Sequence, residues 1–448
     1  MTFFIYFYLN HKRLTIASKG FLVFASLFFY SWWNIVYLPI ILTSILFNFI
    51  VGSSLNDENK KVNKKSLLIF GILVNIALLG YFKYADFFIQ NLNLLTTSNI
   101  GLLHLALPLA ISFFTFQQIA YLVDSYRRET KEYDFLNYAV FVTFFPQLIA
   151  GPIVHHKEMM PQFFSKKNML KNYRNIALGT FIFSIGLFKK VVIADTFAVW
   201  ATAGFDTSET LSFFEAWATS LSYTFQLYFD FSGYTDMAIG LALLFNIKLP
   251  INFNSPYKAK NIQDFWRRWH ITLSNFLRDY IYIPLGGSRN GEFKTYNNLM
   301  ITFLIGGLWH GAGWTFIFWG FLHGAALVVH RVWSLFEFKM WSWLAWLVTF
   351  NFINIAWIFF RAKEWEDAIK ILSGMFSLDD MSFNINYIEA TVLLIGFIIV
   401  LFVKNSTSYL KRKFDFSLQQ ILAFVLMMTI SILVIRLGNS SEFLYFNF

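Results

Sequence analysis

The stretch TYNNLMITFLIGGLWHGAGWTFIFWGFLHGAALVVH, residues 295–330, decides the class of this protein because it contains no Asp, Glu, Lys or Arg. It is longer than the about 20 apolar residues that a helix needs to span a bilayer. Three histidines, His310, His323 and His330, interrupt it. An ionisable group at membrane depth is costly and usually faces a cavity or a bundle interior, so these residues are candidates for function.

Composition extends this interpretation to the whole chain. Of 448 residues, 57% are hydrophobic and 14% are charged, whereas soluble domains carry about 25% charged residues. The pattern predicts an all-α polytopic membrane protein with about eleven transmembrane helices, together with re-entrant and interfacial helices. The expected helices cover residues 20–36, 38–54, 67–93, 104–123, 134–150, 173–201, 211–230, 232–248, 296–309, 314–333, 343–361, 386–403 and 417–436.

Charge and cysteine content limit the possible functions. The net charge of +10 falls mainly in short loops between apolar runs, which is typical of positive-inside topology and does not indicate nucleic-acid binding. The chain has no cysteine, which excludes disulfides, thiolate metal sites and an acyl-thioester on the protein. The first apolar stretch lacks the features of a cleavable signal. Because no internal repeat is visible, we treat residues 1–448 as a single domain.

The spacing of the histidines limits what they can do together. His310 and His323 are 13 residues apart, which is roughly 20 Å on an unbroken helix and places them on different faces. They can meet one reacting atom only if the chain breaks at Gly311 and Gly313. The alternative is that each histidine is hydrogen-bonded to a neighbouring helix. The spacings fit no helical zinc pair, so we expect no metal.

Residues 255–291, SPYKAKNIQDFWRRWHITLSNFLRDYIYIPLGGSRNG, mix charged and aromatic residues. Trp266, Trp269, His270 and Leu273 recur at helical spacing, which predicts an amphipathic helix at the membrane surface. Such a helix either anchors the protein at the interface or forms part of a site. In the second case the arginines hold the phosphates of an anionic donor. The donor-binding candidates are Arg267, Arg268, Trp269, His270 and Arg278.

Three further motifs carry polar groups. Asp230 and Asp236 in LYFDFSGYTDMAIG indicate either a proton path or buried anchors that tie helices together. The motif GPIVHHKEMMPQF, residues 151–163, is either a helix end and loop or the lip of a donor site. The final residues 443–448, FLYFNF, are aromatic and should dock in an apolar pocket, with Tyr445 carrying their only hydroxyl.

Taken together, these motifs resemble the membrane-bound O-acyltransferase family, in its alginate O-acetylase and peptidoglycan O-acetyltransferase branch. The resemblance runs over nearly the whole chain and also includes SLFFYSWWN (26–34) and PLAISFFTFQQIAYLVDSYR (108–127). It implies helices around a central tunnel, with His310 as the catalytic residue, His323 as the second candidate and Trp309 beside them. His155 departs from the arginine usual after GPIV, and the N-terminus begins shorter than in most relatives.

The resemblance also implies a reaction. An acetyl group passes from a cytoplasmic donor, acetyl-CoA, to the outer face for O-acetylation of peptidoglycan or, alternatively, of alginate or another exopolysaccharide. His310 acts as general base, and Tyr445 matches the tyrosine proposed in some relatives to take the acyl group. We expect no tightly bound cofactor, a location in the bacterial inner membrane, contact with lipid, and a separate exported O-acetyltransferase as partner.

Two other classes of function stay open on the residues alone. In a proton-coupled transporter or flippase, the buried His and Asp groups would relay protons, and no acyl donor would be needed. In a purely structural membrane scaffold, replacement of His310 would have no consequence.

Overall fold

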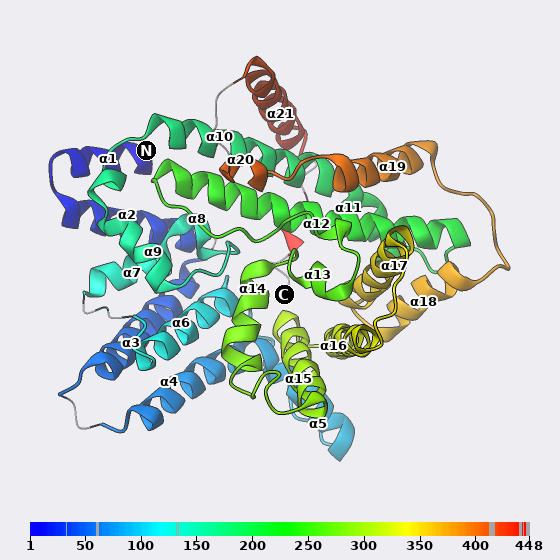
Figure 1. Cartoon of the computed structure of the whole chain (residues 1–448), viewed down its shortest axis with the longest axis horizontal. Helices are drawn as coiled ribbons and strands as arrows, with labels where there is room; N and C mark the ends of the chain where they lie inside the picture. Colours follow the sequence, from blue (N-terminus) through cyan, green and yellow to red (C-terminus); the bar gives the residue numbers. More distant parts are fainter. Residues whose placement is uncertain are drawn as a thin grey trace. The chain divides into compact units, whose positions relative to one another are not determined.

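A computed structural model of the chain describes residues 1–32, 34–59, 62–130, 132, 134–411, 417–438, 441, 443 and 444. The described residues form helices and connecting segments, with no β-strand among them (Figure 1). The all-α prediction is therefore confirmed. Tyr445 and the three residues after it lie outside the described residues.

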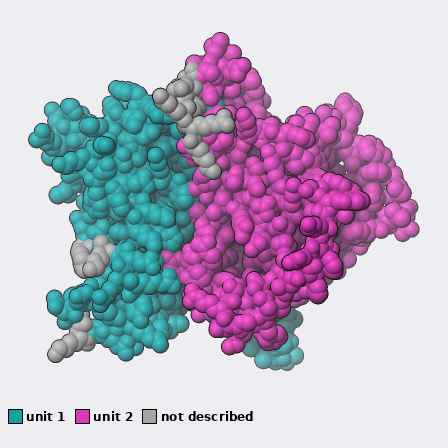
Figure 2. Space-filling model, viewed as in Figure 1, with its two compact units in different colours: residues 1–183, 237–250 teal, residues 184–236, 251–448 magenta. Residues whose placement is uncertain are grey.

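The helices form two compact units, coloured separately in Figure 2. Unit 1 comprises residues 1–183 and 237–250, and unit 2 comprises residues 184–236 and 251–448. Helices α10 and α12 contribute residues to both. The prediction of a single domain stays a prediction.

Unit 1 contains the N-terminal helices, in which α6 packs on α3 and α4 while α2 packs on α1 and α7. Its elements are α1 (Thr2–His11), α2 (Thr15–Ser31), η1 (Ile35–Tyr37), α3 (Leu38–Asn56), α4 (Lys64–Leu79), η2 (Gly80–Tyr84), α5 (Ala85–Thr96), α6 (Ile111–Tyr126), α7 (Phe135–Thr143), α8 (Phe145–Leu148), α9 (His156–Phe164), η3 (Lys166–Met169) and the first part of α10 (Tyr173–Phe188).

Unit 2 contains all the predicted site residues, and in it α15 and α16 lie side by side (Figure 1). After the end of α10 its elements are η4 (Lys189–Ala194), α11 (Asp195–Thr202), η5 (Ala203–Thr207), α12 (Phe213–Leu244), η6 (Pro256–Lys258), α13 (Ile262–Trp266), α14 (Ile271–Leu277), η7 (Arg278–Tyr282), α15 (Glu292–His310), α16 (Trp314–Leu335), α17 (Ser342–Arg361), α18 (Trp365–Phe376), α19 (Tyr387–Phe402), α20 (Thr407–Lys411) and α21 (Leu418–Arg436).

Several expected helix boundaries are wrong. The helix expected at 104–123 begins only at Ile111 in α6, and the helix expected at 134–150 is divided at Phe144 into α7 and α8. The clearest difference lies in α12. The sequence suggested separate helices at 211–230 and 232–248, but α12 runs unbroken from Phe213 to Leu244. Gly233 does not end this helix. A Cβ there would lie 2.8 Å from the carbonyl oxygen of Gly186, so the glycine serves the close approach of α12 to the end of α10. Glycines at helix crossings commonly have this role.

Seven helical segments among the described residues are long and apolar enough to cross a membrane. They are Ile35–Asn56, Lys64–Thr96, Tyr173–Thr207, Trp314–Leu335, Ser342–Arg361, Tyr387–Leu410 and Leu418–Arg436. The chain is therefore a multi-pass membrane protein, although the expected count of about eleven spans is not confirmed. Helices α12 and α15, which carry much of the site, are not among the seven.

Candidate active site

The candidate site is built on the hairpin of α15 and α16, which breaks where the glycines predicted. Helix α15 ends at His310, Gly311 and Gly313 are extended, and α16 begins at Trp314. Any residue can adopt the φ angles of −157° and −163° found at these glycines. Glycine is required at position 311 for a steric reason, because a Cβ there would lie 2.1 Å from the ring of Phe316.

Small residues bring the two helices into close contact. A Cβ at Gly307 would lie 2.3 Å from the carbonyl oxygen of Phe316, and one at Gly320 would lie 2.4 Å from that of Phe303. Both clashes are with backbone atoms, which cannot turn aside as a flexible side chain can. The glycines therefore fix the position of the last turn of α15, which carries His310, relative to α16.

His310 is enclosed by aromatic rings. It is 4% exposed, and its ring centroid lies 5.1 Å from that of Trp319 on α16 and 5.0 Å from that of Phe360 on α17. Its chain neighbour Trp309 is also buried, with the two ring centroids 4.7 Å apart. Three helices thus position one imidazole in an apolar surrounding, where an interaction with a reacting group is little weakened by water.

His323 contacts the same indole as His310, that of Trp319. The Trp319 ring centroid is 4.6 Å from that of His323, so this indole contacts both imidazoles. Trp266 donates its indole N–H to Nδ1 of His323 at 3.2 Å, which makes Nδ1 the acceptor and places the proton of the neutral ring on Nε2. The structure thus brings both histidines into one aromatic cluster and gives His323 a fixed orientation.

The segment 255–291 is not the single amphipathic surface helix that its spacing predicted. It is divided into η6, α13, α14 and η7, and His270, with φ +42°, interrupts the helical path between α13 and α14. Trp266 and Trp269 are 7% and 2% exposed. The aromatic stripe faces the protein core, because the break at His270 folds the segment against α16 and its neighbours.

The predicted donor-binding residues separate into two groups. Arg267 and Arg278 are exposed, and Arg268 is half-buried and donates to Asp264 at 2.8 Å. In contrast, Trp269 and His270 lie in the core. Trp269 packs against other aromatic rings, among them that of Trp357 at 4.9 Å.

His270 has the environment of a buried structural histidine. It is fully enclosed, and burial lowers its pKa to about 3, so the ring is neutral at pH 7. Its Nδ1 lies 3.2 Å from Oδ1 of Asn252. That oxygen also accepts from the N–H and hydroxyl of Thr272, so it acts as an acceptor toward the imidazole as well.

Arg267 and Arg278 line a pocket of about 530 Å³ that also contains two basic residues missing from the donor-binding prediction, His330 and Arg331. Arg331 is paired with Glu292 at 2.6 Å. The pocket reaches the histidine cluster through Trp266 and Phe303, because both of these line it and both have rings near His323. His330 adjoins Arg331, and that dipeptide was the available signal for a basic site.

Asp230 and Asp236 are both ion-paired, with lysines that sequence reasoning overlooked. Lys190 lies 2.9 Å from Asp230, and Lys189 lies 2.7 Å from Asp236. Asp236 also accepts from the hydroxyl of Ser406 at 2.7 Å. These pairs favour buried anchors over a proton path. The signal was the Lys-Lys dipeptide inside the apolar run 173–201.

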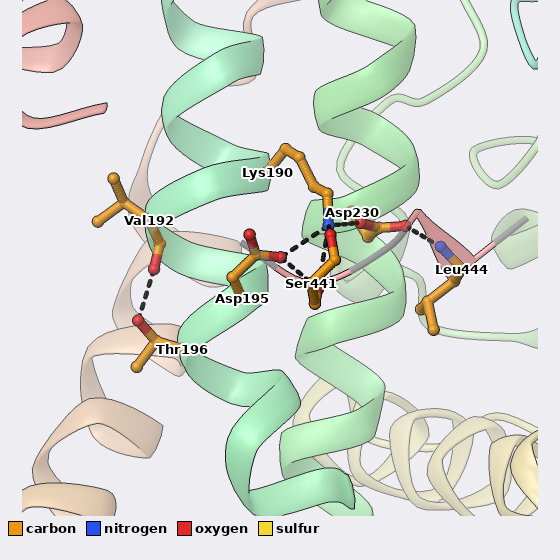
Figure 3. Close-up of polar contacts among 7 residues, drawn as sticks. All are labelled: Lys190, Val192, Asp195, Thr196, Asp230, Ser441 and Leu444. Carbon is orange, nitrogen blue, oxygen red and sulfur yellow. Dashed lines mark hydrogen bonds and ion pairs between the residues drawn. The ribbon is translucent and has the colours of Figure 1, made fainter. Parts of the chain in front are cut away.

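The C-terminal segment enters this charged cluster (Figure 3). Ser441 contacts Lys190 and Asp195, and the backbone N–H of Leu444 donates to Asp230 at 3.0 Å. Phe443 is 6% exposed, as expected for that residue, but docking of the whole stretch 443–448 stays a prediction. Tyr445 itself lies outside the described residues.

The motif 151–163 belongs to unit 1, where it ends in α9. Nδ1 of His155 lies 3.3 Å from a carboxylate oxygen of Asp124. Burial lowers the pKa of His155, but the hydrogen bond and charge of Asp124 outweigh that effect and raise the pKa above its usual value. A role as the lip of a donor site stays a prediction.

The residues that the structure describes include no group of three or more His, Cys, Asp and Glu side chains arranged to hold a metal ion. The expectation that the protein binds no metal stays a prediction.

Comparison with known proteins shows similarity over nearly the whole chain. The family model described as MBOAT, membrane-bound O-acyltransferase family, matches residues 3–363. A peptidoglycan O-acetyltransferase of Helicobacter pylori is 52% identical, covering 99% of this chain and 94% of its own length. A protein of Pseudomonas aeruginosa named "Probable alginate O-acetylase" is 39% identical over 89% of this chain and 77% of its own. A teichoic acid D-alanyltransferase of Streptococcus thermophilus is 28% identical over 50% of this chain and 57% of its own.

Proposed function

The chain belongs to the membrane-bound O-acyltransferase family, and from that premise we propose that it moves an acetyl group across the bacterial cytoplasmic membrane for O-acetylation of peptidoglycan. The name of the Helicobacter pylori relative supports the choice of acceptor. The donor is acetyl-CoA on the cytoplasmic side, and the route is the tunnel expected for the family. A separate exported O-acetyltransferase completes the transfer to the polysaccharide.

His310 is the general base in this proposal. Its imidazole takes the proton of an acceptor hydroxyl as the hydroxyl oxygen attacks the thioester carbonyl. The new C–O ester bond forms, the C–S bond breaks, and the proton returns from His310 to the thiolate of coenzyme A. With Tyr445 as the acceptor, whose phenol has an ordinary pKa of about 10, the products are an acetyl-tyrosine ester and free coenzyme A.

The pocket next to the histidine cluster supports a place for the donor. Arg267 and Arg278 at its wall suit the phosphates of coenzyme A, since guanidinium groups bind phosphate through paired N–H groups. Trp266 lines this pocket and donates to His323, and Trp319 contacts both His323 and His310. The proposal assigns His323 a supporting position along this route, because its Nδ1 is engaged by Trp266.

The observation that carries the proposal is the placement of His310 at the broken end of α15, enclosed by Trp319 and Phe360. We expect His310→Ala to abolish release of coenzyme A and transfer of label from radiolabelled acetyl-CoA by purified protein. His11→Ala, which removes an exposed imidazole in α1, is the matched control and should retain activity. Retained activity in His310→Ala would reject the assignment.

The same assay separates an enzyme from a transporter. A proton-coupled transporter would neither release coenzyme A nor acquire label. The acceptor is tested separately, by measuring the O-acetyl content of peptidoglycan isolated from a strain that lacks the protein. If an exopolysaccharide loses its acetyl groups in that strain while peptidoglycan is unchanged, the exopolysaccharide is the acceptor and the proposal of peptidoglycan is rejected.

A further inference from the structure

The charged cluster of Lys190, Asp195 and Asp230 holds the C-terminal segment by its main chain (Figure 3). The Lys190 ammonium donates to the carbonyl oxygen of Ser441 at 3.0 Å and contacts its hydroxyl at 3.1 Å. Asp230 accepts the N–H of Leu444 at 3.0 Å. Main-chain contacts at two points three residues apart fix the path of the segment and its register along α12.

The cluster is built into the interior of unit 2. The side chains of Lys190, Asp195 and Asp230 are 11%, 3% and 2% exposed. Lys190 lies 2.7 Å from Asp195 and 2.9 Å from Asp230, so the ammonium bridges two carboxylates. The two oxygens of Asp230 have different partners, since Oδ1 faces Lys190 and Oδ2 accepts from Leu444.

The C-terminal segment completes the hydrogen bonding of these charges. Ser441 donates its hydroxyl to Asp195 at 2.6 Å, so the segment supplies one donor to each carboxylate and two acceptors to the ammonium. A buried charge that loses such a partner bears a substantial free-energy cost. The cluster is therefore most stable when the segment is bound.

An aromatic contact adds a third point of attachment. Phe443 stacks on Tyr234 with ring centroids 4.5 Å apart and an interplanar angle of 25°. Tyr234 is four residues after Asp230 on α12, so both face the same side of that helix. The residues immediately before Tyr445 are thus bound by charged groups, by main-chain hydrogen bonds and by ring stacking.

We propose that Lys190, Asp195 and Asp230 form a tail receptor, which binds the C-terminal segment through Ser441 and Leu444 and so positions Tyr445, the next residue in the chain, as the acyl acceptor. Lys190 and Asp230 are then positioning residues. The acceptor role of Tyr445 rests on the proposed function, whereas binding of the segment by the tail receptor does not.

The absence of cysteine gives a direct test, because Leu444→Cys introduces a single thiol into the full-length protein. The backbone N–H that reaches Asp230 is retained in this variant. We measure the rate at which a maleimide modifies the thiol in detergent-purified protein. Adding Lys190→Met should raise this rate by about tenfold or more, since charge-assisted hydrogen bonds to the segment are lost. Lys190→Arg should restore most of the protection.

Lys189→Met is the matched control for removal of a buried lysine. Lys189 precedes Lys190 and pairs with Asp236 at 2.7 Å, but that pair is tied to Ser406, and neither of its members bonds to Ser441 or Leu444. It should leave the labelling rate within about twofold of the parent. An equal increase in both lysine variants, or no increase in Lys190→Met, would overturn the tail receptor.

A milder variant covers the case in which Lys190→Met does not fold. Ser441→Ala removes the hydroxyl contacts to Lys190 and Asp195 but leaves the pairing between those two residues. It should also raise the labelling rate of Leu444→Cys, by a smaller factor. An unchanged rate in a folded Ser441→Ala protein would contradict the proposal.

Mass spectrometry of the C-terminal peptide after incubation with labelled acetyl-CoA tests the proposed function separately. If Lys190 protects the thiol but Tyr445 is not acetylated, the tail receptor is supported and the acceptor role of Tyr445 is rejected. Acetylation of Tyr445 that is unchanged by Lys190→Met rejects the positioning role. Acetylation that falls in Lys190→Met and returns in Lys190→Arg supports both.

Discussion

Replacement of Gly307 by alanine should disable the enzyme through a displacement of less than one ångström. The added Cβ would lie 2.3 Å from the carbonyl oxygen of Phe316, whereas real Cβ atoms essentially never come within 3.0 Å of another atom. Going from 2.3 to 3.0 Å, α15 and α16 must separate locally by about 0.7 Å. The obstacle is backbone, so no rotamer change relieves it.

The displacement reaches the imidazole proposed as the general base, because His310 is one helical turn beyond Gly307. A misplacement of about 1 Å can cost about 100-fold in rate, which corresponds to about 2.7 kcal/mol of activation free energy. We therefore expect Gly307→Ala to lower the rate of coenzyme A release from acetyl-CoA by between about tenfold and 100-fold. The free energy of unfolding should fall by about 1–3 kcal/mol, as for other overpacked cores.

Gly306→Ala is the control, since it adds the same methyl group one residue earlier. There the nearest atom is the end of the flexible Leu277 side chain, at 3.2 Å, which can move aside. This variant should keep a rate within about twofold of wild type. Wild-type activity in Gly307→Ala, or an equal loss in both variants, would refute the argument from backbone contact.

Three further predictions concern other parts of the protein. Trp266→Phe removes the N–H donated to His323 but keeps a ring, and it should lower the free energy of unfolding by about 1–3 kcal/mol; unchanged thermal unfolding would contradict this. Arg267→Ala should raise KM for acetyl-CoA about tenfold but not for acetyl-pantetheine, which lacks the nucleotide phosphates, whereas Arg268→Ala should change neither. The pKa of His155 is raised in the folded state, so its charged pair with Asp124 stabilises the protein below about pH 6.5. This stabilisation is lost as the pH rises through the folded pKa. His155→Gln should therefore lower Tm more at pH 6 than at pH 9.

Much of the fold followed from local pattern. Apolar runs predicted most helices to within a few residues, and the glycines after His310 marked a true break. The division of residues 211–248 failed because Gly233 signals a breaker in isolation but serves helix packing here. The amphipathic period of residues 262–273 suggested one surface helix, yet the left-handed conformation of His270 turns the segment inward.

Sequence alone determined the membrane class and the family and made His310 the leading candidate for the catalytic residue, because hydrophobicity, motif order and the cost of a buried imidazole are all properties of the chain itself. Only the tertiary structure brought His310 and His323 to one shared indole, that of Trp319, paired Asp230 with Lys190, and joined Arg267 to Arg331 in one pocket. Each group joins residues from different helical segments, and their meeting depends on how closely the helices pack. Backbone contacts at glycines such as Gly307 set that closeness.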